Sequence, residues 1–126
     1  MLGLKIYNGL NGLLYSLYGI IGVFMPAVVF EANALNAISV HGSHSIRGLW
    51  GAVCVLGIII LWKGLKLETA RATTMMIAMV SAGLAVARLL GVAIDGTEGW
   101  LSDQYGPLVI ESTMAVVGGF LYARSK

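Results

Sequence analysis

The stretch that decides the fold covers residues 6–30 and reads IYNGLNGLLYSLYGIIGVFMPAVVF. None of these 25 consecutive residues carries a charge. An α-helix needs about 20 predominantly apolar residues to cross the hydrocarbon core of a bilayer. The stretch therefore predicts a transmembrane helix, with Pro26 near its end.

The composition of the whole chain favours a membrane protein. Of its 126 residues, 58% are hydrophobic and only 11% are charged, whereas about 25% are charged in an ordinary soluble domain. The chain lacks the polar residues that cover a soluble surface, and it is too hydrophobic for intrinsic disorder. A single cysteine, Cys54, excludes a disulfide scaffold, and a net charge of +2 is too small for a nucleic-acid-binding protein. We therefore expect one integral membrane domain over residues 1–126.

Three further spans follow if each takes in one embedded charge. The other uncharged runs are too short to cross a bilayer alone, and they lie at 48–62, 72–87 and 112–123. Each becomes long enough with one neighbouring charge, which is Arg47, Arg88 or Glu111. The runs are continuous and lack the alternation of a membrane β-barrel. The sequence thus predicts an all-α, integral membrane bundle of four transmembrane helices, at about 6–30, 40–62, 72–94 and 105–123.

Loop charges predict the orientation of this bundle. Basic residues gather at the N-terminus, in the loop between the second and third spans, and in the tail, as Lys5, Lys63, Lys66, Arg71, Arg124 and Lys126. The other two loops contain acidic residues and no Lys or Arg. The positive-inside rule then places both termini in the cytoplasm. An alternative is a signal peptide cleaved at Ala32-Asn33-Ala34, which would leave three spans, but the apolar run is too long for one.

Small residues form a seam on each predicted helix. Helices in membranes associate through close packing at such residues, because lipid is as apolar as their larger side chains. The seams contain Gly12, Ser16, Gly19, Gly48, Gly51, Gly83, Ala87, Gly91, Ala115 and Gly118. We interpret them as contacts within a tight four-helix bundle, and one seam is expected to contact another subunit or a second copy.

The embedded charges are the first candidate site. Arg88 and Glu111 lie at matching depth on helices joined by a short loop, so we expect them to pair. Arg47 would complete an Arg–Glu–Arg triad, and Asp95 would lie at its outer mouth on the face of Arg88. Such a cluster either fixes helix register or binds a ligand, since charges inside a membrane are expensive and often functional. The spare cation would favour an anionic group.

Metal and catalytic motifs are sparse. His41 and His44 lie three residues apart and are the candidates for a metal site, but two ligands do not make one. The sequence contains no phosphate-binding glycine loop, nucleophile elbow or CxxC pair. We therefore expect a non-enzymatic protein without a cofactor.

Several segments resemble a known family. They are Phe24-Met25-Pro26, Ser45-Ile46-Arg47-Gly48-Leu49-Trp50-Gly51, Ala87-Arg88-Leu89-Leu90-Gly91-Val92-Ala93-Ile94-Asp95-Gly96, and the later Glu111. This pattern is similar to domain of unknown function 4345, a family of small bacterial four-helix membrane proteins. The resemblance covers nearly the whole chain and implies a multi-pass protein of the bacterial inner membrane. It draws attention to Arg47, Arg88, Asp95 and Glu111, and it implies no activity.

Three functions remain compatible with the sequence. The first is an accessory or structural subunit of a larger membrane assembly, as the small size, short loops and glycine seams indicate. The second is an oligomeric binder or carrier of a small anionic or amphiphilic solute or lipid, acting through the Arg–Glu cluster. The third is a membrane enzyme or redox protein, which would need a bound quinone, haem or metal. The expected partners are the lipid bilayer and either other membrane subunits or copies of the chain, and no nucleic acid.

Overall fold

The protein is all-helical over the part of the chain that its computed structural model describes, residues 1–32, 40–95 and 105–125. The helices in this part are α1 (Leu2–Phe24), α2 (Pro26–Ala32), α3 (Val40–Gly64), α4 (Ala70–Asp95) and α6 (Tyr105–Arg124). The expected all-α fold is thus confirmed for these residues. The bounds of α3, α4 and α6 agree with the predicted second, third and fourth spans to within two residues.

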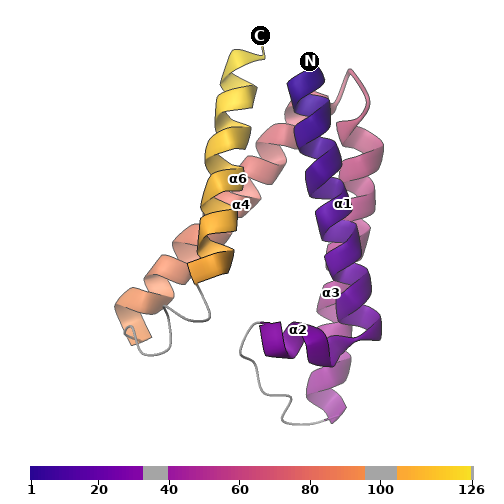
Figure 1. The fold of residues 1–126 in the computed structure, drawn as a ribbon, viewed down its shortest axis with the longest axis vertical. Coiled ribbons are helices and arrows are strands. Elements are labelled where there is room, and N and C mark those ends of the chain that lie inside the picture. Colours follow the sequence, from indigo (N-terminus) through magenta and orange to yellow (C-terminus); the bar gives the residue numbers. More distant parts are fainter. Residues whose placement is uncertain (33–39, 96–104, 126) are drawn as a thin grey trace.

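The long helices form two pairs. In Figure 1, α1 runs beside α3 and α4 runs beside α6, and the two helices of each pair point in opposite directions. We call α1 with α3 the N-terminal pair, and α4 with α6 the C-terminal pair. The pairs approach each other at the end where both chain termini lie, and they diverge toward the opposite end. The fold is therefore a splayed arrangement of two helix pairs and not an evenly packed bundle.

The first predicted span ends earlier than expected. It is not continuous to residue 30, because α1 ends at Phe24 and the short α2 begins at Pro26. Between them Met25 has φ −127° and ψ 59°, outside the helical region. A residue before proline is disfavoured in the helical conformation, and proline has no N–H to continue the helix. Pro26 therefore breaks the helix, and α2 turns across the splayed end (Figure 1).

Small residues hold the N-terminal pair together. A Cβ atom added to Gly19 would lie 2.5 Å from the Cα of Cys54, and one added to Gly57 would lie 2.8 Å from the carbonyl oxygen of Gly12. The Cβ at Gly57 would also overlap the backbone nitrogen of Ser16. The backbones of α1 and α3 thus approach closely, as helices in membranes do at small residues. Gly12, Ser16 and Gly19 of α1 therefore lie on the face that packs against α3.

A buried asparagine connects the two pairs at the end where they meet. The side-chain amide of Asn8 donates hydrogen bonds to the carbonyl oxygens of Gly64, 3.1 Å away, and Ala70, 2.9 Å away. Its carbonyl oxygen accepts a hydrogen bond of 2.8 Å from the hydroxyl of Thr74. Nearby, the hydroxyl of Tyr7 donates to the carbonyl oxygen of Met114 at 2.7 Å. These bonds link α1 to both ends of the α3–α4 turn and to α6.

Three helical segments in the described part of the chain are long and apolar enough to cross a membrane. They are His44–Gly64, Ala70–Ile94 and Tyr105–Arg124. Helix α1 is not among them, although it has 23 residues. It contains Lys5, two asparagines and three tyrosines, which lower its apolar character. The four-span count therefore stays a prediction.

Within the described part of the chain, the seam expected on the third span does not pack against another helix. A Cβ atom added to Gly83 or Gly91 would have no neighbour within 4 Å, and Ala87 is exposed. The inward face of α4 instead contains Ser81, Ala85 and the partly buried Arg88, spaced at three and four residues. Gly83 lies two residues from Ser81, so it points the opposite way. On α3, Gly48 and Gly51 also escape tight contact, whereas Gly118 of α6 is buried against Tyr7 and Ala115 is half-buried.

Candidate ligand-binding site

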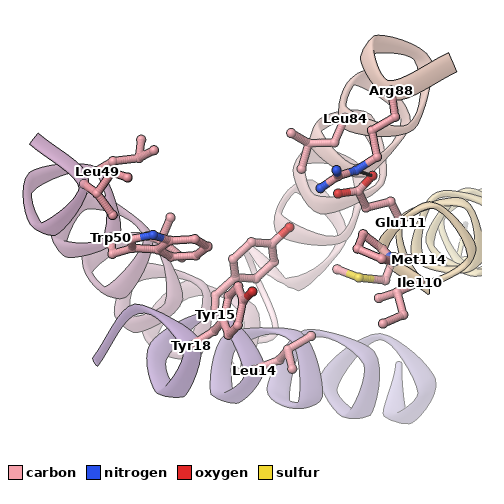
Figure 2. Close-up of a pocket in the computed structure, with 13 residues that line it drawn as sticks. Leu14, Tyr15, Tyr18, Leu49, Trp50, Leu84, Arg88, Ile110, Glu111 and Met114 are labelled. Atoms are coloured by element: carbon pink, nitrogen blue, oxygen red, sulfur yellow. Dashed lines mark hydrogen bonds and ion pairs between the residues drawn. The ribbon is translucent and has the colours of Figure 1, made fainter. Parts of the chain in front are cut away.

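A cleft of about 560 Å³ lies between the two pairs. This volume is within the range of roughly 300–1,000 Å³ that is typical of small-molecule sites. All four long helices contribute to its lining, which consists of Leu14, Tyr15, Tyr18, Ile46, Leu49, Trp50, Val53, Leu84, Arg88, Pro107, Ile110, Glu111 and Met114. Figure 2 shows α1 and α3 on one side of this space and α4 and α6 on the other. The cleft thus exists because the pairs diverge.

The wall formed by the N-terminal pair is apolar and aromatic. Tyr18 and Trp50 pack edge to face, with ring centroids 4.6 Å apart and an angle of 86° between the rings, a preferred aromatic geometry. Trp50 is held against α1 because Gly22 has no side chain there: a Cβ atom on Gly22 would overlap the indole ring. A glycine of the seam therefore positions the aromatic wall.

The wall formed by the C-terminal pair contains an ion pair. Nε of Arg88 donates a hydrogen bond to Oε2 of Glu111 over 2.8 Å. The side chain of Arg88 is 27% exposed and that of Glu111 is 12% exposed. The expected pairing of these two residues is therefore present. Figure 2 shows the pair facing the cleft from α4 and α6, opposite the aromatic wall.

The triad predicted with Arg47 does not form. Arg47 is exposed on α3, it does not line the cleft, and among the described residues no ion pair joins it to Glu111. The reason is helical spacing: Ile46, Trp50 and Val53 face the cleft at three- and four-residue intervals, so Arg47 is turned away. The spare cation that would favour an anionic ligand is therefore not in the cleft wall.

The remaining candidate residues are less informative. Asp95 ends α4, but its side chain lies outside the described part, as does that of His41 in α3. His44 is exposed. Within the described residues, no three His, Cys, Asp or Glu side chains are grouped to bind a metal ion.

Sequence reasoning missed the aromatic wall. No motif in the sequence indicated that Trp50, Tyr15 and Tyr18 would line a site. The signal was the common face: Asn8, Asn11, Tyr15 and Tyr18 follow each other at intervals of three and four residues on α1. A mostly apolar cavity whose charged groups gather at one point, the Arg88–Glu111 pair, can bind and orient an amphiphilic molecule.

The comparisons identify a family and nothing more specific. Residues 3–122 match the family described as Domain of unknown function (DUF4345). No curated protein and no solved structure matches the chain.

Proposed function

The chain belongs to the DUF4345 family, and on that premise we propose that it binds a small amphiphilic molecule of the membrane in the cleft between its two helix pairs. The observation that carries this proposal is the cleft lining. An apolar and aromatic wall faces a wall with a single ion pair, Arg88–Glu111. A hydrophobic molecule would bury its apolar surface against the first wall and place one polar group at the second.

The proposal includes a membrane arrangement of four spans with both termini in the cytoplasm of a bacterial inner membrane. Helix α1 packs along α3, so it would cross the bilayer at the same depth. Basic side chains stack on aromatic rings near the end that holds the termini: Lys63 and Lys66 on Trp62, Arg71 on Tyr122, and Arg124 on Phe120. Basic residues favour the cytoplasmic side, and aromatic rings favour the interface. The cleft would then lie in the outer half of the bilayer.

Site-specific photocrosslinking tests this function. Val53 lines the cleft, whereas Val55, on the same helix, is 55% exposed and does not line it. Each is replaced in turn by the photoreactive benzoylphenylalanine, the protein is irradiated in its own membrane, and the adducts are weighed. We expect position 53 to capture one defined small molecule and position 55 to capture the bulk phospholipid mixture. The same mixture at both positions would contradict a ligand site.

An accessory role in a larger assembly is a second candidate, favoured by one observation. Gly83, Ala87 and Gly91 form a small-residue seam on α4 that no other part of the described chain covers. Such a seam permits close approach of another helix in a membrane. The chain would then dock through α4 and leave its cleft accessible to lipid.

Co-purification tests the accessory role. In mild detergent, the wild-type protein should carry a larger subunit in fixed ratio, and Gly83→Leu should lose it. A Gly119→Leu variant is the control, because Gly119 of α6 also has open space around its Cα. Purification without any partner, or equal loss in both variants, would exclude docking through this seam.

A further inference from the structure

We infer that the molecule bound in the cleft is uncharged, and that it meets Arg88 and Glu111 with a hydroxyl or a similar group that both donates and accepts hydrogen bonds. This inference rests on the proposed function and specifies the chemistry of its ligand. The sequence had favoured an anionic group, so the structure changes the expected class of ligand.

The first argument is the charge of the wall. Arg88 and Glu111 neutralise each other at 2.8 Å, and among the described residues of the lining they are the charged ones at neutral pH. Arg47, the expected extra cation, is exposed on α3 and does not line the cleft. The described lining therefore carries no net charge that would balance an ionic ligand.

The second argument is the cost of adding a charge. A third ionised group in an apolar cleft loses its hydration. The ion pair compensates for little of this loss, because the attraction of the added charge to one partner is offset by its repulsion from the other. An anion would also compete with Glu111 for the guanidinium group. An uncharged group avoids both penalties.

The third argument is the hydrogen-bonding capacity of the wall. A guanidinium group only donates hydrogen bonds, and an ionised carboxylate only accepts them. Both groups border the cleft, so the wall presents donors and acceptors side by side. A hydroxyl group matches this arrangement, because it carries one donor and two acceptor sites.

The fourth argument is the rest of the cavity. Tyr18, Trp50 and the aliphatic side chains around them offer an apolar surface across from the ion pair (Figure 2). The helices that form this surface also carry exposed apolar side chains outside the cleft, such as Val55 and Ile58, which are suited to lipid. The bilayer is therefore the source to which we commit, and the ligand is a membrane-dissolved alcohol or comparable neutral amphiphile.

Three probes of equal chain length test the inference. Tetradecanol, tetradecanoate and tetradecylammonium are added to the whole protein in mild detergent, at a pH where the acid and the amine are both ionised. Binding is followed by the fluorescence of Trp50 in a Trp62→Phe/Trp100→Phe variant, since Trp50 lines the cleft. We expect tetradecanol to bind at least about tenfold more tightly than either ion, a ratio that corresponds to about 1.4 kcal/mol.

Charge variants give a second readout. Glu111→Gln should shift the preference toward tetradecanoate, and Arg88→Gln should shift it toward tetradecylammonium, while Arg47→Gln leaves the wild-type order unchanged. If the cleft variants fail to fold, the order in which the three probes bind to the unaltered cleft still tests the inference.

The outcomes separate the inference from the function beneath it. An ion that binds as tightly as the alcohol would overturn the inference and leave a ligand-binding cleft in place. No binding by any of the three probes would overturn both.

Discussion

Arg88 and Glu111 are the residues on which the site depends, and each is stabilised by the other. Their partial burial makes the pair sensitive to the loss of one member, since the remaining charge stays in an apolar cleft. Asn8 has the same importance at the opposite end of the molecule. It is fully buried, and its one amide group forms hydrogen bonds with the end of α3 and with the first turns of α4.

The ion pair should behave as a coupled unit. We expect Arg88→Met and Glu111→Leu each to lower the free energy of unfolding by roughly 1.5–3 kcal/mol, the value of hydrogen bonds to charged groups. The double variant should lose less than the sum, because neither member of the pair is then left facing the gap of the other. Unfolding by denaturing detergent, arranged as a double-mutant cycle, measures the coupling. Additive losses, or an equal loss in the control Arg47→Met, would show that the pair is not coupled.

The two buried asparagines of α1 offer a matched comparison. Asn8→Ala removes hydrogen bonds to Gly64, Ala70 and Thr74, and should cost roughly 1–3 kcal/mol of unfolding free energy, because buried polar groups lose a partner. The amide of Asn11 donates to Tyr7 within the same helix, so Asn11→Ala should cost less. Thermal unfolding in detergent ranks the two variants. If Asn11→Ala is instead the less stable variant, Asn8 is not the residue that connects the two helix pairs.

At the scale of residues, the sequence predicted the pairing of Arg88 with Glu111 but not the separation of Arg47 from it. Equal depth of two charges on neighbouring helices can be counted along the chain. The direction of Arg47 depends on which face of α3 contacts α1, and this face is chosen by Gly57 and Cys54 deeper in the helix.

Helices α1 and α3 form the most closely packed element pair, and their glycines explain why. The seam Gly12–Ser16–Gly19 meets Gly57 and Cys54 with backbone-to-backbone contact. By contrast, α4 and α6 leave Gly83, Gly91 and Gly119 open. Gly118 is the exception on α6, because a Cβ atom there would meet Tyr7 and Ala78. Most glycines of the C-terminal pair thus leave an open face among the described residues.

Alanine substitutions on α3 separate these two situations. Gly57→Ala should reduce the free energy of unfolding by roughly 1–3 kcal/mol, because its Cβ atom overlaps the backbone of Ser16. Gly51→Ala meets only Val23, at an ordinary 3.9 Å, and should stabilise by up to about 1 kcal/mol through helix propensity. Detergent unfolding of the two variants gives the comparison. Equal stability would mean that the close approach of α1 and α3 is absent.

At the scale of elements, length and charge located α3, α4 and α6 well, because each is a long apolar helix with few charges, and such a run is visible in the sequence. The end of α1 was misplaced. Residues 25–30 are uncharged and apolar, so the hydropathy stays high past Phe24. The helix nevertheless ends at Phe24, because Pro26 restricts the backbone of the residue before it. The spacing of the small residues could not predict which seams would pack against a neighbouring helix and which would stay exposed.

The described part of the molecule consists of two helix pairs that meet at one end and diverge toward the other (Figure 1). No pattern in the sequence predicted this splay, since helix periodicity reports faces and not the angle between pairs. The cleft follows from that angle, and so does the opposition of the aromatic wall to the ion pair. The site was therefore predictable in its charged half only.

Cysteine labelling tests the proposed crossing of α1. In a Cys54→Ser background, single cysteines are placed by Leu2→Cys, His44→Cys or Ser125→Cys. With four spans, an impermeant maleimide should label His44→Cys on intact cells, and should label the other two only after permeabilisation. Labelling of Leu2→Cys from outside, with Ser125→Cys inside, would mean that α1 does not cross the membrane.

The most direct test of a ligand site in the cleft is native mass spectrometry of the protein extracted from its own membrane in mild detergent. The wild-type protein should retain a defined extra mass, and a Leu84→Trp variant, which fills the cleft, should lose it while keeping its unfolding temperature within a few degrees. Leu84 and Val55 are both exposed, but of the two only Leu84 lines the cleft, so Val55→Trp serves as the control that keeps the mass. A bare wild-type protein, or the same mass on all three, would contradict the account.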